Sequence, residues 1–301
     1  MSQADSLLSP SPVMIDEVIV RPLPTLTQRI RYFVRHQPIG VSGMVIIAIV
    51  MLAAIFAPQI APYEPTAQDF KRLQPPSAIN WLGTDDLGRD EFSRIVHGSR
   101  ISLQVGLIAV TLALSIGATL GVLSGYIGGE FDSWTMRIVD LMFAFPGLVL
   151  AIVITGLLGP SITNTMIAIG IIYAPTFARV ARGSVLTVQN NLYIEAARQM
   201  GGGNFYIVSR HVLPNILAPL IVLLTLTMST AILTEAALSF LGLGTQPPFP
   251  SWGKMLSEGS RFMEIAWWTT VFPGIAIVIA VLGFNLLGDG LRDALDPQMR
   301  E

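Results

Sequence analysis

Six long apolar runs, separated by polar connections, limit what this chain can fold into. They cover residues 41–61, 102–127, 138–158, 162–178, 216–241 and 267–287. A helix needs about 20 apolar residues to cross the hydrocarbon core of a bilayer. Backbone polar groups cannot stay unpaired in lipid, so each run is expected to be a helix. The fourth run is short and is interrupted by Tyr173-Ala174-Pro175. The sequence therefore predicts an all-α integral membrane protein with about six transmembrane helices.

The charge content supports this prediction. Charged residues make up 13% of the chain, whereas a soluble domain carries about a quarter. Most of the surface is therefore expected to face a lipid bilayer. The net charge of −2 argues against a nucleic acid as partner. The chain has no Cys and only His36, His97 and His211, so we expect no disulfide and no metal site in this chain.

The 18 Lys and Arg residues favour an orientation with both termini in the cytoplasm. Eleven of them then lie inside, the side that normally carries the excess of positive charge. The cluster of Arg29, Arg31 and Arg35 just before the first run agrees with this orientation. The first run begins at about residue 39 and is longer than the apolar core of a signal peptide, so we expect a retained helix.

This orientation divides the chain into five parts. They are a cytoplasmic tail at 1–38, a first transmembrane helix at 39–61, an outer loop at 62–101, a membrane domain at 102–290 with five helices and an inner loop at about 182–215, and a cytoplasmic tail at 291–301. In the second run, small residues recur every four positions and so share one helical face. They are Ala109, Ala113, Gly117, Gly121 and Gly125. This face is expected to pack closely, either on another helix of the chain or on another subunit.

The inner loop has the pattern of a short helix, a sharp turn and a second helix. Residues 195–200 are good helix formers, and the three glycines at 201–203 are expected to end that helix. The apolar residues of 205–208 then resume a helix. Glu195 and Arg198 lie one turn apart and can pair on the surface. Such an element can fit a groove on a cytoplasmic partner.

The spacing within this loop resembles the EAA motif of bacterial ABC-importer permeases. Glu195-Ala196-Ala197 is followed after three residues by Gly201, and after eleven more by Leu213-Pro214. In that family the loop docks into a cleft of the ATPase subunit. The resemblance therefore assigns ATPase coupling to Glu195, Ala196, Ala197, Arg198, Gly201, Gly202, Arg210, Leu213 and Pro214. His211 stands where the general motif has an aliphatic residue, but the run 210–215 is similar to the peptide and nickel subgroup.

Three further stretches resemble the same subgroup. They are 81–94 with 98–103 in the outer loop, 235–248 with 252–256, and 284–297. Together the matches span roughly residues 40–297 and are similar to the C-type permeases of dipeptide, oligopeptide, glutathione and nickel importers. The resemblance implies the type I ABC importer permease fold in the bacterial inner membrane, with a periplasmic outer loop.

The same resemblance implies the function and the partners. This chain would form half of the translocation pathway for dipeptides or oligopeptides, with a nickel chelate or glutathione as alternative solutes. The implied partners are a second, homologous permease subunit, two ATP-binding subunits and a periplasmic solute-binding protein. The only lysines, Lys71 and Lys254, do not fit the Gly-x4-Gly-Lys-Ser/Thr pattern of a P-loop. We therefore expect no cofactor and no catalytic residue in this chain, with ATP and Mg bound by partner subunits.

Charged residues in or near the apolar runs are candidates for the translocation pathway. Glu235 lies deepest and is the best candidate, the alternative being a packing contact with a backbone amide or a hydroxyl such as that of Thr234. Asp140 is the second candidate, although a local pair with Arg137 is the simpler interpretation.

In the outer loop, Asp85, Arg89, Asp90 and Arg94 could contact the binding protein or cap the pathway. The alternative is a solvated helix start capped by Asp90 or Ser93.

Two other classes of protein remain as rivals. An ion-coupled secondary transporter needs several buried acids, and uptake that survives loss of the ATPase but collapses with the proton gradient would favour it. A membrane anchor or scaffold needs neither the inner loop nor the structured outer loops, and purification without an ATPase would favour it.

Overall fold

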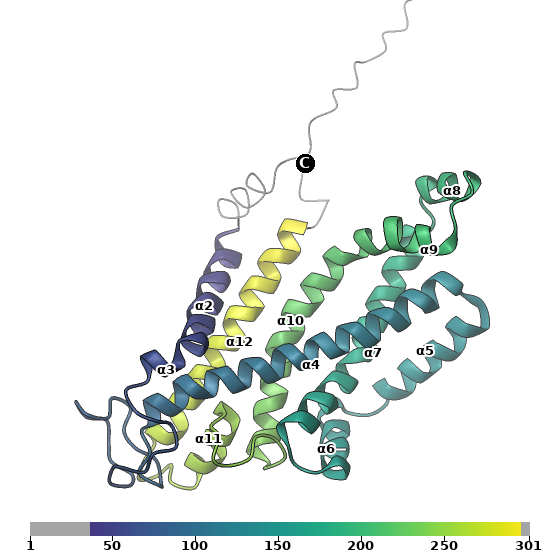
Figure 1. Cartoon of the computed structure of the whole chain (residues 1–301). Helices are drawn as coiled ribbons and strands as arrows, with labels where there is room; N and C mark the ends of the chain where they lie inside the picture. Colours follow the sequence, from purple (N-terminus) through teal and green to yellow (C-terminus); the bar gives the residue numbers. More distant parts are fainter. Residues whose placement is uncertain (1–36, 296–301) are drawn as a thin grey trace, which may run out of the picture. The chain divides into compact units, whose positions relative to one another are not determined.

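The computed structural model describes residues 37–295, and all regular elements in that range are helical. In chain order they are α2 (Pro38–Ile55), α3 (Ala57–Ile60), α4 (Glu91–Ile127), α5 (Gly129–Phe143), α6 (Gly147–Leu158), α7 (Ile162–Val188), α8 (Leu192–Gln199), α9 (Asn204–Ile207), a π-helical turn (Val208–Val212), α10 (Leu213–Phe240), α11 (Trp252–Ser260) and α12 (Trp268–Leu295). Figure 1 shows their arrangement. Almost all of the tail predicted at 1–38, and the end of the tail predicted at 291–301, lie outside the described residues.

Among the described residues, four helical segments are long and apolar enough to cross a membrane. They are α2, α4, α12 and the continuous segment Asn204–Phe240, which includes α10. A fifth span results if α5 and α6 are counted together. The prediction of about six spans is therefore met only in part by length and composition.

The third predicted span, at 138–158, is wrong as a single helix. α5 and α6 are bent by 91° at the break between them. Pro146 lies in this break and forms the N-cap of α6. Proline lacks the backbone N–H that a continuous helix needs, and its ring clashes with the preceding turn. The sequence Phe145-Pro146-Gly147 is therefore the cause of the bend.

The fourth predicted span, at 162–178, ends too early. α7 continues through Pro175 to Val188. Its side chains Ile169, Phe177 and Val185 are fully buried. Neighbouring helices thus surround much of α7, and packed neighbours are what allows proline inside such a helix. A helix in the interior of the bundle also needs less apolar surface than one that faces lipid.

The small-residue face of α4 packs against α7, the most extensive helix contact in the described part of the chain. A Cβ added to Gly117 would lie 2.2 Å from the carbonyl oxygen of Ala174. A Cβ added to Gly121 would lie 2.2 Å from the carbonyl oxygen of Ala178. Only glycine permits this approach, so the small-residue face of α4 serves packing within the chain.

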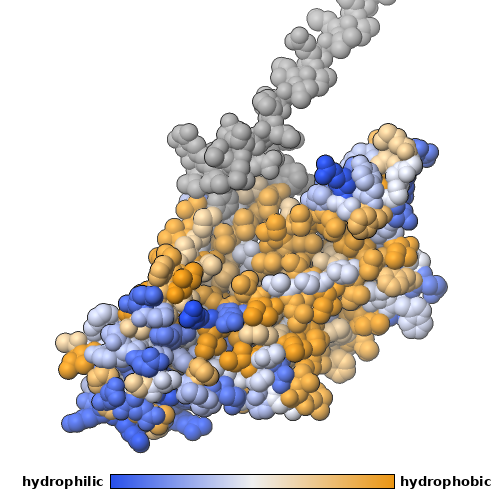
Figure 2. Space-filling view, in the orientation of Figure 1, coloured by the Kyte–Doolittle hydropathy of each residue, from blue (hydrophilic) through white to orange (hydrophobic). Residues whose placement is uncertain are grey.

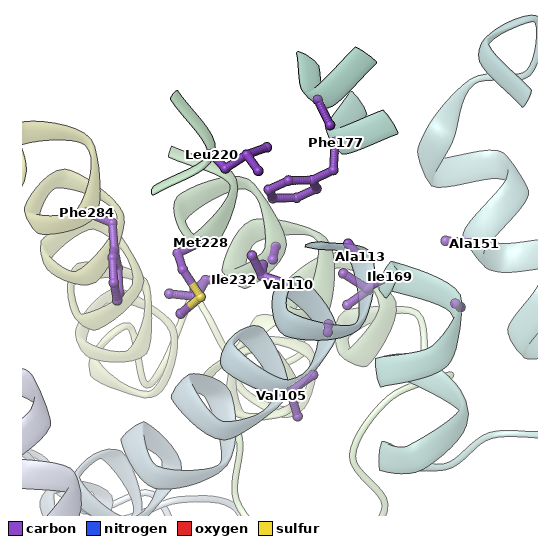
Figure 3. Close-up of a cluster of buried hydrophobic side chains, with 14 of the residues drawn as sticks. Val105, Val110, Ala113, Ala151, Ile169, Phe177, Leu220, Met228, Ile232 and Phe284 are labelled. Atoms are coloured by element: carbon purple, nitrogen blue, oxygen red, sulfur yellow. The ribbon is translucent and has the colours of Figure 1, made fainter. Parts of the chain in front are cut away.

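The core lies where α4, α7, α10 and α12 meet. Figure 3 shows Val110 of α4, Ile169 and Phe177 of α7 and Ile232 of α10 in this cluster. Beside it α2 packs along α12, where a Cβ on Gly43 would lie 2.4 Å from the backbone nitrogen of Leu287. Small residues thus hold both helix pairs together, as expected where lipid supplies no hydrophobic force between helices.

Polar surface gathers at two ends of the bundle. In Figure 2 hydrophilic residues surround the segment 61–90 at the lower left and α8 at the upper right, with hydrophobic surface between them. Exposed Ile49, Leu120 and Leu282 come from helices in this apolar band. In Figure 1 the start of α2 and the end of α12 lie at the α8 end, and α3 and α11 lie at the other.

Candidate functional site

The inner loop folds as its sequence predicts. The run of good helix formers that starts at Glu195 lies in α8, which ends at Gln199. Gly201 follows in a left-handed conformation with φ of 85°. The N–H of Gly202 donates to the carbonyl of Ala197, and the N–H of Gly201 donates to that of Arg198, both at 3.0 Å. This pair of bonds is a Schellman cap, in which a glycine is strongly favoured at the left-handed position.

Two buried side chains fix α8 on the rest of the bundle. Ile194 is fully buried and Ala197 almost so, on one side of the helix. Ile207, just after the turn, is also fully buried. The hydroxyl of Tyr126, at the end of α4, contacts Asn204 Oδ1 at 3.0 Å. The inner loop is thus bound to the bundle on both sides of its turn.

The other side of α8 is exposed. Glu195, Ala196 and Arg198 lie there, and no ion pair joins Glu195 to Arg198 within the described residues, contrary to expectation. The guanidinium of Arg198 instead lies over the ring of Tyr126, with 5.8 Å to the centroid. Glu195 and Ala196 of the EAA motif therefore remain exposed, while Ala197 is buried against the bundle.

Large apolar side chains surround this polar face. Leu192 is 81% exposed, Met200 82% and Phe205 86%. Leu192 belongs to α8, Met200 follows it and Phe205 belongs to α9; Figure 2 shows hydrophilic surface around α8. The sequence did not predict their exposure, because this depends on how α8 projects from the bundle.

α9, the π-helical turn and α10 form one continuous helical segment, Asn204–Phe240. Pro214 lies at the start of α10, directly after the π-helical turn. Arg210 and Leu213 are exposed in this region. His211 packs beside the ring of Tyr206, with 5.4 Å between centroids. A π-helical turn accommodates a proline that cannot donate in the regular ladder.

Glu235 is a fully enclosed contact between helices. It is 1% exposed. Its Oε1 accepts a hydrogen bond from the Ser239 hydroxyl at 2.7 Å, and Oε2 accepts one from the Ser102 hydroxyl of α4 at 3.2 Å. The expected partner Thr234 instead bonds the hydroxyl of Tyr173. Glu235 thus makes a packing contact with hydroxyl groups, as the alternative interpretation expected, but these belong to Ser239 and Ser102 and not to Thr234. The contact with Ser102 joins α10 to α4.

Asp140 does not pair with Arg137, so the predicted local pair is wrong. It accepts from Arg179 of α7 at 2.6 Å, and both side chains are more than half exposed. A second, less exposed pair lies one turn away, where Arg182 donates twice to Asp132 at 2.6 Å. These pairs join α5 to α7. Partners about 40 residues away could not be read from the sequence.

The outer-loop charges form a buried network and not a solvated helix start. Asp90 caps α4 as predicted, accepting from the backbone N–H of Ser93 at 2.8 Å. Asp85 Oδ2 pairs with Arg89 Nε at 2.5 Å and with Arg94 Nε at 3.4 Å. Each of the four predicted residues, Asp85, Arg89, Asp90 and Arg94, is at most 5% exposed.

Glu258 of α11 also joins this network, although no pattern in the sequence indicated it. Its Oε2 lies 3.0 Å from Arg89 Nη2 and 3.1 Å from Arg94 Nη2. Arg94 also donates to the carbonyl of Pro65 at 3.2 Å. The network thus connects the outer loop, α4 and α11. A pair separated by so much of the chain leaves no local signal in the sequence.

Comparison with known families decides what this bundle is. Residues 117–301 match the family described as the binding-protein-dependent transport system inner membrane component. Residues 25–76 match the N-terminal transmembrane domain of oligopeptide transport permease C. The chain belongs to this permease family. The permease is a multi-pass membrane protein and a transport subunit, as the resemblance implied.

Relatives of the permease cover most of its length. It is 51% identical to the dipeptide transport system permease protein DppC of Alkalihalophilus pseudofirmus, over 88% of both chains. It is 44% identical to the probable D,D-dipeptide transport system permease protein DdpC of Escherichia coli, over 89% of this chain and 90% of that one. It is 42% identical to the glutathione transport system permease protein GsiD of Pectobacterium atrosepticum, over 98% and 97%.

A solved structure confirms the fold. A chain of the inward-facing MetNI methionine ABC transporter superposes with a TM-score of 0.57 at 21% identity, covering 68% of this chain and 98% of that one. The permease therefore has the type I ABC importer permease fold.

Proposed function

We propose that this permease forms half of the translocation pathway of an ATP-driven importer of dipeptides or oligopeptides, and that α8 couples it to an ATP-binding subunit. The solute follows from the names of its relatives, which are dipeptide permeases at 51% and 44% identity. Glutathione remains the alternative because a glutathione permease is 42% identical over nearly the whole chain. A nickel chelate is the remaining alternative solute.

The exposed face of α8 is the observation that carries the coupling role. Leu192, Met200 and Phe205 are exposed at a polar end of the bundle. Exposure of large apolar side chains to water is unfavourable unless a partner covers them. Glu195 and Arg198 on the same surface supply charges that can orient the partner. A short, stiff helix with this mixture of groups fits a groove on an ATP-binding subunit.

A force on α8 reaches the membrane helices through rigid contacts. On one side Ile194 and Ala197 are packed into the bundle. On the other side the helical segment that starts at Asn204 runs without interruption into α10. Closure of the ATP-binding subunits would therefore displace α10 together with the end of α4, opening the pathway toward the outer face by alternating access.

The remaining parts of the machine follow from this role. A second, homologous permease completes the pathway, two partner subunits bind ATP and Mg, and a periplasmic binding protein delivers the solute to the end that carries α11. The α8 end, with the start of α2 and the end of α12, then faces the cytoplasm. The pathway residues would include Glu235 or Asp140 only if their charge is needed for uptake.

The coupling role is tested with Glu195→Ala and, as matched control, Glu264→Ala, which removes an exposed carboxylate at the other end. We expect Glu195→Ala to leave melting temperature and membrane insertion unchanged. Solute uptake and copurification of the ATP-binding subunit should fall by about tenfold, the effect of one important interface side chain. The control should match the wild type.

A second variant tests the turn. Gly201→Ala places a Cβ at φ of 85° and should disturb the orientation of α8 while the buried core stays intact. If both variants import and copurify like the wild type, α8 is not the coupling element. Uptake that persists without ATP-binding subunits but needs a proton gradient would show an ion-coupled transporter instead. Competition between a dipeptide and glutathione distinguishes the solutes.

A further inference from the structure

A small cavity between the start of α4 and α11 is surrounded by carboxylates. Asp85, Asp86, Glu91 and Glu258 line it, together with Arg94 and four uncharged residues, Met255, Gly259, Phe262 and Thr269. Its free volume is about 10 Å³, which is about the size that holds one water molecule or one ion. The cavity is separate from the inner loop, because α11 and α8 lie at different ends of the bundle in Figure 1.

Three of these carboxylates are spaced like ligands around one ion. One oxygen each of Asp85, Asp86 and Glu258 lie within 4.8 Å of one another. Calcium binds carboxylate oxygens at about 2.3–2.6 Å, so two ligands on opposite sides of the ion are separated by up to about 5 Å. The observed spread fits that geometry without movement of the backbone.

Glu91 supplies independent evidence that something belongs in the cavity. Its side chain is 1% exposed. Its Oε1 is buried and has no hydrogen-bond partner among residues 37–295. An unpaired carboxylate oxygen in the interior is costly, and native structures normally satisfy such groups with a partner, water or ion. Because Glu91 lines the same cavity, a cation there would supply the missing partner.

The two arginines of the network neutralise only part of the carboxylate charge. Arg89 and Arg94 both pair with Asp85 Oδ2 and Glu258 Oε2. Asp86 remains 30% exposed, with its closest arginine nitrogen at 3.9 Å. Counting the four carboxylates as ionised, together with Arg94 of the lining and Arg89, which pairs with Asp85 and Glu258 from outside it, the cluster has a formal charge of −2. The other lining residues carry no charge, so a divalent cation would make the cluster neutral.

We propose that this cavity is a calcium site, with Asp85, Asp86 and Glu258 as ligands and Glu91 as the buried fourth carboxylate. The expectation of no metal in this chain rested on the lack of Cys and the scarcity of His, and an all-oxygen site uses neither. The ion would bind the outer loop to α11, and thereby to α10 and α12, against which α11 packs. This inference does not depend on the solute or on the coupling role of α8.

The test uses the full-length chain purified in detergent, freed of metal with a chelator, and titrated with CaCl2. We expect one bound Ca²⁺ per chain by equilibrium dialysis and a rise in melting temperature. Asp86→Asn and Glu91→Gln should each weaken calcium binding by about tenfold or more, since carboxylate count sets affinity in such sites. Glu264→Gln, an exposed acid at the same end, should bind like the wild type.

Three results would overturn the site. One is no calcium binding at millimolar concentration. Another is equal binding by Asp86→Asn, Glu91→Gln and the wild type. The third is a higher melting temperature for Glu91→Gln with an unchanged response to calcium, which would mark Glu91 as a buried acid without a ligand. Binding of Mg²⁺ or Mn²⁺ without Ca²⁺ would refute the assignment to calcium.

Discussion

The contact between α4 and α7 leads to a quantitative expectation for Gly121→Ala. The added Cβ would lie 2.2 Å from the carbonyl oxygen of Ala178 and 2.8 Å from the Cβ of Ala181. Ordinary contacts of these kinds need about 1 Å more, and a backbone carbonyl cannot rotate away as a side chain can. The two helices would have to separate over several turns.

Overpacking of this kind costs about 1–3 kcal/mol, while alanine in a helix gains about 1 kcal/mol over glycine. We therefore expect a net destabilisation of up to about 2 kcal/mol, seen as an apparent melting temperature that is lower by up to several degrees at the same heating rate. Gly183→Ala is the matched control, because Gly183 is also helical, lies on α7 and has nothing within 4 Å of an added Cβ.

The control should melt at or slightly above the wild-type temperature. The measurement is the loss of monodisperse protein after heating in detergent. If Gly121→Ala melts with the wild type while Gly183→Ala behaves as expected, α4 and α7 do not approach as closely as described. A similar loss in both variants would instead point to a general intolerance of alanine in these helices.

Two further expectations separate roles that the sequence left open. Arg182→Ala should destabilise the chain by about 1–3 kcal/mol, because it leaves the half-buried Asp132 without its charged donor. Arg179→Ala should cost under about 1 kcal/mol, because its pair is largely exposed; equal melting temperatures would contradict both. Glu235→Gln keeps acceptor and donor for the hydroxyls, so we expect normal melting and normal uptake if the residue serves packing. Normal melting with lost uptake would identify a pathway charge.

The sequence predicted well those features that depend on residues within one helical turn of each other. The glycines after α8 and the Asp90 cap are found where expected, because a cap depends on residues next to it. The apolar runs also predicted the positions of α2, α10 and α12, because the hydropathy of a run is a property of one continuous stretch of sequence. The inner loop could thus be described as helix, turn and helix from its residues alone.

The failures come from proline and from distant contacts. Pro146 breaks a predicted span, whereas Pro175 does not, and the difference lies in how neighbouring helices surround α7. The partners of Asp140 and Glu258 lie far away in the sequence and follow only from the folded bundle. The sequence of a membrane protein predicts which segments face lipid or water, but it does not predict which buried charged residues form pairs.

The length of α4 has a mechanical consequence. Its 37 residues extend about 55 Å at 1.5 Å per residue, well beyond the roughly 30 Å of a hydrocarbon core. One end carries Arg94 of the outer network, and the other reaches Tyr126 beside the inner loop. A tilt of about 5° in such a rod displaces one end by about 5 Å relative to the other. α4 is therefore a lever through which an event at one membrane surface is felt at the opposite one.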